Sequence, residues 1–448
     1  MRVHAVTSTT PTFAEATRVF GKIGLLSFGG PAGQIALMHK VLVEEKKWLD
    51  EGRFLHALNY CMLLPGPEAM QLATYAGWLL HGVRGGLMAG LLFVLPGALV
   101  LTALSAAYLM LGEITLVEGL LFGLKAAVLA VVLEALIRVS KRALKSGAMV
   151  VLAIAAFVAI AFLKLPFPLI IVAAAAVGAL RHLAGAQGSP PAGGTVEDQA
   201  PEIDLPEWTR PSLRRFAGTL AIWLALWFGP LIALHAALGG DNVFAKEASF
   251  FSIMAAVTFG GAYAVLAWVA QQAVEIYGWL RPDEMLTGLG LAETTPGPLI
   301  LVLVFVGFLG GARLSGLDPL TGGLAGAVVS LWFTFVPCFL WIFAGAPYVE
   351  TVRNVRWLAS ALEAVTAAVV GIIANLAVWF ALHVLFATVG EWRLGPLSLP
   401  VPDVSTFDWA AAAIALAAGV ALLRFHRNVV MVLGAAAAAG MVLRLAGS

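Results

Sequence analysis

The sequence predicts an all-α polytopic membrane protein built from two homologous halves. Its 448 residues are 60% hydrophobic and only 12% charged, whereas soluble domains carry about 25% charged residues. Apolar runs of about 17–25 residues, the length that crosses a bilayer, recur along the chain. One pattern of Gly and Pro residues also occurs twice within these runs. Together these observations predict about 13 transmembrane segments, some of them broken.

The candidate spans are the apolar runs long enough to cross a bilayer. The first half contains runs near residues 16–40, 54–80, 87–112, 115–137, 147–163 and 165–180. Residues 183–215 are rich in Pro, Gly and acidic side chains, a composition that predicts a flexible cytoplasmic linker. Further runs lie near residues 216–238, 249–271, 285–311, 322–346, 357–385, 407–423 and 429–445. We therefore divide the chain into an N-terminal half (1–182), the linker (183–215) and a C-terminal half (216–448).

The repeated pattern consists of Phe-Gly-Gly, Trp and Pro-Gly-Pro at the same spacing in both halves. The copies are Phe28-Gly29-Gly30, Trp48 and Pro65-Gly66-Pro67, followed 231 residues later (259 − 28) by Phe259-Gly260-Gly261, Trp279 and Pro296-Gly297-Pro298. Gly-Gly and Pro-Gly-Pro break helices, and a break inside a membrane is tolerated where it lines a cavity. Broken helices at corresponding places in two halves predict a transporter.

The number of spans between the copies sets their relative orientation. The first copy begins at span 1 and the second at span 8, and this odd offset predicts an inverted repeat. If 147–163 and 165–180 formed one kinked span, the repeats would instead be parallel. The distribution of Lys and Arg in the loops favours a cytoplasmic N-terminus in a bacterial-type inner membrane. The polar stretch before Phe13 does not resemble a cleaved signal peptide, so we expect the first span to direct insertion.

The sequence around the first copy resembles the chromate ion transporter family. The resemblance rests on Phe-x-Lys-x-Gly-x-x-x-Phe-Gly-Gly-Pro at Phe20–Pro31, a Lys-Trp-Leu loop, and the run Asn59–Ala69 around Pro-Gly-Pro. It spans both halves, and it implies export of chromate from the cytoplasm, chromate resistance, and sulfate as a chemically similar competitor. The second half departs from the pattern, because Ala262 replaces the Pro after Gly-Gly and Ile253 stands at the position of Lys22.

Helix breaks suit a tetrahedral dianion, because a helix N-terminus offers free N–H groups and about half a positive charge. We expect Lys22 to act as a counter-ion to the bound oxyanion. The alternatives are that the breaks only bend helices for packing and that Lys22 reaches to the lipid headgroups. The candidates for substrate binding are Lys22, Ser27, Gly29, Gly30, Asn59, Pro65, Gly66, Pro67, Gly260, Gly261, Thr294, Thr295, Pro296, Gly297 and Pro298.

Two acidic residues, Glu68 and Glu293, flank the Pro-Gly-Pro turns on opposite sides. We expect the Glu68 carboxylate to compete with the dianion for the same positive helix end, so that its protonation vacates the site. This competition would couple proton and anion movement in opposite directions, as in an antiporter. The alternative is a carboxylate that only caps free N–H groups.

Other classes of protein fit the sequence less well. It contains no His-Glu-x-x-His, Gly-x-Ser-x-Gly or Gly-x-x-x-x-Gly-Lys motif, so we do not expect an enzyme. The net charge of +1 argues against nucleic acid. Two cysteines, Cys61 and Cys338, cannot form a thiolate cluster, and we expect neither metal nor cofactor. The expected partners are chromate or a sulfate-like oxyanion, protons and the lipid bilayer, with a homodimer left open. Alternatives are an anion channel, or uptake of sulfate or another oxyanion.

Overall fold

The computed structural model describes residues 11–28, 30–112, 114–184, 207–259, 261–348, 356–395 and 397–447. Most of these residues are helical, in agreement with the class that the composition predicts. Within the described ranges, six helices are long and apolar enough to span a membrane, and several shorter apolar helices accompany them. Most of the predicted linker, residues 185–206, lies outside the described residues.

The elements from α1 to α4 recur in the same order in the second half, from α9 to α13. The first half comprises α1 (Phe13–Leu26), α2 (Gly30–His39), the π-helix η1 (Lys40–Glu45), α3 (Glu51–Cys61), α4 (Glu68–Leu111), α5 (Thr115–Ala143), α6 (Gly147–Ala161) and α7 (Phe167–Leu183). The remainder comprises α8 (Leu213–Leu238), α9 (Val243–Val257), α10 (Ala262–Ala270), the π-helix η3 (Gln271–Ile276), α11 (Pro282–Thr294), the short 3-10 helix η4 (Leu299–Leu301), α12 (Val302–Leu314), α13 (Pro319–Gly345), α15 (Arg356–Leu385), β1 (Val389–Leu394), β2 (Leu397–Pro402), α16 (Trp409–Leu423) and α17 (Val429–Gly447).

The predicted span near residues 16–40 consists of two short helices that fold back on each other. α1 begins where the Thr12 hydroxyl accepts a hydrogen bond from the Glu15 N–H at 3.2 Å. Lys46, just after η1, forms an ion pair with Glu15 at 2.9 Å. The outer ends of α1 and η1 therefore lie side by side, and the break between α1 and α2 is the tip of the pair. Gly30 at this tip has a φ of +73°, which favours glycine.

The next predicted span, near residues 54–80, is also a folded pair. It consists of α3, the Pro-Gly-Pro turn and a short first arm of α4, which reverses at His81 and Gly82 with non-helical backbone angles. The arms on both sides of this reversal pack tightly, since a Cβ on Gly77 would lie 2.3 Å from the Gly85 carbonyl oxygen. The Phe13 ring contacts His81 edge-on, with 5.5 Å between ring centroids. The reversal therefore lies beside the start of α1.

The second half contains two matching folded pairs. α9 and α10 turn at residues 258–261, and α11 and α12 turn at Pro-Gly-Pro, so the predicted spans near 249–271 and 285–311 are folded as well. The outer ends of these pairs meet each other. A Cβ on Gly310, near the end of α12, would lie 2.7 Å from Glu247 Oε1 on α9 and 3.1 Å from Trp279 in the turn after η3.

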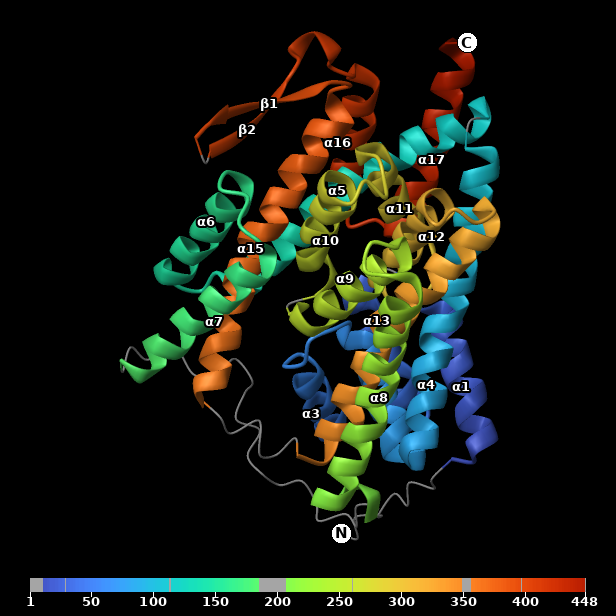
Figure 1. Ribbon diagram of the computed structural model, residues 1–448, viewed down its shortest axis with the longest axis vertical. Helices are drawn as coiled ribbons and strands as arrows, with labels where there is room; N and C mark the ends of the chain where they lie inside the picture. The colour runs from blue at the N-terminus through green and yellow to red at the C-terminus, as the bar shows by residue number, and fades with distance from the viewer. Residues whose placement is uncertain are drawn as a thin grey trace.

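The long second arm of α4 links the outer ends of the two sets of pairs. Its start at the His81 reversal adjoins α1, whereas Tyr108 near its far end donates a hydrogen bond to Glu284 on α11 at 3.0 Å. Figure 1 shows the same separation, with α1 and α3 in the lower part of the molecule and α10, α11 and α12 in the upper part.

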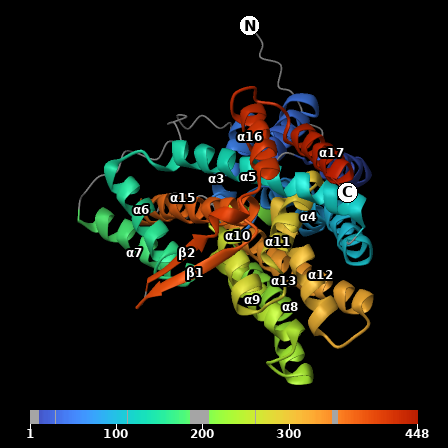
Figure 2. The same ribbon diagram turned by 90° about the horizontal axis from the view of Figure 1, so that it is seen from above.

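The remaining helices pack around these pairs. α15 runs against α5, α6 and α7, α13 packs on α8 and α9, and α16 and α17 lie along α5 (Figure 2). The runs near 147–163 and 165–180 form the separate helices α6 and α7, with Lys164 in a left-handed conformation (φ +51°) between them. After α15, β1 and β2 form an antiparallel hairpin around Gly395, which the all-α prediction missed.

The outer surface of the helices is apolar. Leu99 is 70% exposed, Val151 66% and Ile232 65%, on α4, α6 and α8 respectively. Large apolar side chains in such numbers on the outside of a helical protein fit a lipid surrounding better than water. The structure and the composition together identify an integral membrane protein.

Candidate functional site

The tips of the four folded pairs meet inside the molecule. We name them tip 1 (27–30), tip 2 (65–67), tip 3 (258–261) and tip 4 (295–298). The Gly297 N–H in tip 4 donates to the Ser27 carbonyl oxygen in tip 1 at 2.8 Å. The Gly66 N–H in tip 2 donates to the Thr258 carbonyl oxygen in tip 3 at 2.7 Å. The Pro-Gly-Pro tip of each half therefore pairs with the Gly-Gly tip of the other half.

Glycine is required where the Pro-Gly-Pro tips pack. Gly66 and Gly297 have φ values of +120° and +95°, a region that side chains rarely adopt. A Cβ on Gly66 would also lie 2.9 Å from the Cys338 sulfur on α13. Tip 4 is held equally closely, because a Cβ on Gly97 of α4 would lie 1.9 Å from the Pro296 carbonyl oxygen. The tips therefore have little freedom to shift unless α4 and α13 move as well.

Each tip leads into the N-terminus of a helix: tip 1 into α2, tip 2 into α4, tip 3 into α10, and tip 4 through η4 into α12. The first N–H groups of a helix have no partner within it and carry part of the positive end of the helix dipole. Four helix starts therefore converge on the place where the tips meet. An arrangement of this kind attracts an anion.

Two buried glutamines support the tips. Gln34 Nε2 donates to the Gly297 carbonyl oxygen at 2.6 Å, and Gln71 Nε2 donates to the Pro65 carbonyl oxygen at 2.8 Å. The Oε1 atom of each has no hydrogen-bond partner among the described residues. A buried acceptor without a partner is unfavourable, so both positions suit a water molecule or a protonated ligand.

Glu293 lies beside tip 1 and is only 5% exposed. It lines a small pocket with Gly30, Thr295 and Gly297. Its Oε1 accepts a hydrogen bond from the hydroxyl of Tyr263, which stands in the first turn of α10 next to tip 3. Glu293 therefore connects the Gly-Gly tips of both halves.

Glu68 occupies the corresponding place beside tip 3. It is the first residue of α4 and partly buried, and a Cβ on Gly261 would lie 3.9 Å from its Oε1. A carboxylate in the first turn of a helix is stabilised by the free N–H groups there. Each Gly-Gly tip thus has one carboxylate next to it: Glu293 at tip 1 and Glu68 at tip 3.

Two arginines on α5 were missed as site candidates from the sequence. Arg138 is half-buried and Arg142 is exposed, and both lie near the C-terminal end of α5. Arg138 also pairs with Glu134 at 2.7 Å. The apolar run ends at residue 137, so both arginines fall outside the predicted span, but α5 continues to Ala143. Their four-residue spacing, which places Glu134, Arg138 and Arg142 on one helix face, was the available signal.

The other predicted residues take different places. The hydroxyls of Ser27, Thr294 and Thr295 donate to carbonyl oxygens of their own helices, at 2.7, 2.9 and 3.0 Å. Lys22 and Asn59 lie on exposed faces of α1 and α3, and no described residue forms an ion pair with Lys22. Their part in binding stays a prediction. Gly29 and Gly260 fall outside the described residues.

Fold and site together define an integral membrane transporter whose broken helices converge on a central site. The family model described as "Chromate transporter" matches residues 14–179 and 246–441, so the chain belongs to the chromate transporter family. The recognition made from the sequence motifs is thereby confirmed.

Curated relatives cover most of the chain. A "Probable chromate transport protein" of Synechococcus elongatus is 28% identical over 401 residues, covering 87% of this chain and 92% of the relative. "Chromate transport protein" of Cupriavidus metallidurans is 27% identical, covering 82% of each. "Chromate transport protein" of Pseudomonas aeruginosa is 32% identical, covering 79% of this chain and 77% of the relative. Family membership supports chromate transport and identifies a transporter, not an enzyme. No solved structure matches the chain significantly.

Proposed function

We propose that this protein exports chromate, or a sulfate-like oxyanion, from the cytoplasm in exchange for protons and thereby confers chromate resistance. The observation that carries the proposal is the reciprocal pairing of the tips, Gly297 with Ser27 and Gly66 with Thr258. This pairing brings helix starts from both halves to one place. The names of the relatives support chromate as the anion.

The anion binds by backbone donors, with the two arginines of α5 balancing its charge. Helix N-termini at the tips supply N–H groups and partial positive charge without a fixed counter-ion. Arg138, which pairs with Glu134 at 2.7 Å, and the exposed Arg142 add positive charge from α5.

Proton coupling resides in Glu68 and Glu293. Each carboxylate lies next to a Gly-Gly tip, where a dianion and an ionised carboxylate repel each other. The anion and the carboxylate therefore occupy the positive helix end in turn. After the anion leaves to the outside, the carboxylate takes its place and binds a proton from that side, and it releases this proton to the cytoplasm before the next anion displaces it. Glu68 and Glu293 belong to different halves. Because the halves move in turn, each carboxylate occupies the helix start at its own Gly-Gly tip in turn.

The two halves form an inverted repeat, with units at 1–182 and 216–448. Support comes from the α4 arm, which joins the outer ends of the first-half pairs to those of the second-half pairs at its opposite end. With the N-terminus in the cytoplasm of a bacterial-type cell, the first-half pairs enter the inner membrane from the cytoplasmic side. The second-half pairs then enter from the other side. Such symmetry allows one site to open to each side in turn.

The test measures chromate accumulation in inside-out membrane vesicles, with and without an acidic interior and with excess sulfate. The wild type is compared with Glu293→Gln and with the control Glu45→Gln on the exposed end of η1. We expect the wild type and the control to accumulate chromate only with the gradient, and sulfate to reduce accumulation. Glu293→Gln should lose the gradient dependence and keep chromate exchange. Equilibration without accumulation would indicate a channel, and accumulation only in right-side-out vesicles would indicate uptake.

A further inference from the structure

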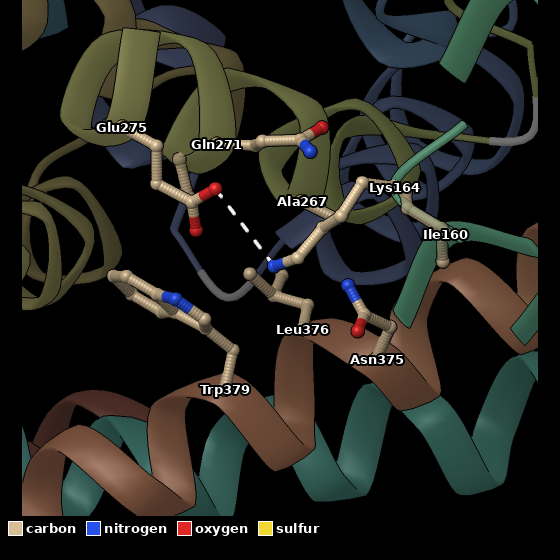
Figure 3. A pocket seen from close by; sticks show the side chains of 9 residues that line it. Ile160, Lys164, Ala267, Gln271, Glu275, Asn375, Leu376 and Trp379 are labelled. Atoms are coloured by element: carbon tan, nitrogen blue, oxygen red, sulfur yellow. Dashed lines mark ion pairs between the residues drawn. The ribbon is translucent and has the colours of Figure 1, made fainter. Parts of the chain in front are cut away.

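A second polar pocket lies between α10, η3, α15 and the turn before α7 (Figure 3). Its polar side chains are Lys164, Gln271, Glu275, Asn375 and Trp379, and its volume is about 30 Å³. This space suits one or two water molecules and is too small for a tetrahedral dianion with its contacts.

The pocket contains a loose ion pair. Lys164 Nζ lies 3.8 Å from Glu275 Oε2, and each of the two side chains is 36% exposed. Figure 3 shows the Lys164 ammonium between the Glu275 carboxylate and the Asn375 amide, with Gln271 directed toward the same space. Lys164 also has a left-handed backbone (φ +51°), which is unfavourable for a residue with a side chain. A strained residue with a weakly held charge is typical of a functional position.

This pocket lies on one face of α10 and η3, and the same face reaches the central site at the N-terminal end of α10. Tyr263, Ala267, Gln271 and Glu275 recur every four residues, a spacing that aligns them along one helix face. Tyr263, at one end of the row, bonds to Glu293, whereas Glu275 at the other end bonds to Lys164. Ala267 in between is small and buried. The row therefore leads from the tips toward the outer end of the second-half pairs.

The matching face in the first half is not covered in the same way. Ala36 and Lys40 on α2 and η1, which correspond to Ala267 and Gln271, are both exposed. Ala267 is only 5% exposed, because α15 packs against α10. The packing of α15 thus closes the second-half face, whereas the matching first-half face is exposed.

We propose that this pocket is a second oxyanion subsite on the transport path, at the side of the second half, and that Lys164 exchanges its partner there. In the closed state Lys164 is neutralised by Glu275. When α10 and α15 separate, the passing dianion takes the Lys164 ammonium from Glu275, and the amides of Gln271 and Asn375 donate to the anion. Glu275 then repels the anion and prevents it from resting there. The inference depends on the proposed transport function.

Transport kinetics of charge variants test the subsite. We compare chromate accumulation in vesicles for Lys164→Gln, Lys164→Arg and the control Lys246→Gln, whose lysine pairs with Asp241 at 3.3 Å outside the pocket. Loss of a charge-assisted contact should raise the half-saturating chromate concentration about tenfold in Lys164→Gln. Lys164→Arg should stay within about threefold of the wild type, because it keeps the charge. Equal values for Lys164→Gln and the control would overturn the proposal.

A binding measurement separates this inference from the proposed function. In purified protein we follow alkylation of Asn375→Cys by N-ethylmaleimide with and without sulfate, which does not oxidise thiols. The native Cys61 and Cys338 are buried, and the unmodified protein gives their background. Sulfate should slow labelling of Asn375→Cys and leave the exposed control Ile276→Cys unchanged. If sulfate inhibits chromate transport and does not protect Asn375→Cys, the subsite is refuted while the transport function stands. If the wild type moves no chromate, the proposed function itself fails.

Discussion

Replacement of Gly97 by Ala should disable transport while the protein still folds. Gly97 lies on the long arm of α4 against tip 4, and its Cβ would lie 1.9 Å from the Pro296 carbonyl oxygen and 2.7 Å from Leu301 Cδ1. Side-chain carbons rarely come closer than 3.0 Å to another heavy atom, so tip 4 must move by at least 1.1 Å (3.0 − 1.9). The obstacle is backbone, so a change of rotamer cannot relieve it.

The magnitude follows from the bonds that hold tip 4. The Gly297 N–H to Ser27 bond is 2.8 Å long and the Gln34 to Gly297 bond is 2.6 Å long. A shift of this size breaks or weakens both, at about 1 kcal/mol each, and overpacking adds about 1–3 kcal/mol. A misplacement of about 1 Å can reduce the rate of a geometrically demanding step about 100-fold. We expect a transport rate reduced by about this factor.

The assay is the initial rate of chromate accumulation in vesicles, divided by the amount of protein in the membrane. Gly229→Ala in α8 serves as the matched control, because no atom lies within 4 Å of the added Cβ. Size-exclusion chromatography in detergent checks that both variants remain folded. Transport by Gly97→Ala at the rate of the control would refute the idea that the position of tip 4 governs transport.

Three further outcomes follow from the same account. Arg138→Gln should raise the half-saturating chromate concentration about tenfold, whereas Lys141→Gln on the same helix should not, as concentration series in vesicles would show. Glu68→Gln should reduce proton release per chromate, measured with a pH-sensitive dye, and an unchanged ratio would remove Glu68 from coupling. For the inverted repeat, a membrane-impermeant thiol reagent should label Glu45→Cys and Ile276→Cys, which are matched exposed positions, from opposite sides. Labelling of both from one side would show parallel repeats.

The sequence predicted where the helices break, and it could not predict where the chain goes afterwards. Gly-Gly and Pro-Gly-Pro mark the breaks because they disturb helical backbone wherever they occur. The direction after each break depends on contacts between distant residues, such as Lys46 with Glu15. For this reason four apolar runs that were expected to cross the membrane fold back instead.

The sequence indicated the backbone breaks that form the candidate site, but it did not indicate all of the charged residues near them. The repeat marked all four tips, but their pairing across the halves cannot be read from either copy alone. The fourth predicted span ends at residue 137 because the apolar run ends there. This boundary excluded Arg138 and Arg142, although the polar face continues to the end of α5. The hydroxyls near the breaks looked like free donors, yet each has an acceptor on the preceding turn, as Ser27 has in Ile23.

The most direct test of the central claim is to locate the anion. Selenate is a tetrahedral dianion like chromate and sulfate, and selenium gives an anomalous X-ray signal. Crystals of the purified protein soaked in selenate should show an anomalous peak between tip 1 and tip 4 or between tip 2 and tip 3, within hydrogen-bond distance of backbone N–H groups. A peak that contacts none of the four tips, with selenate still competing for chromate transport, would contradict the account.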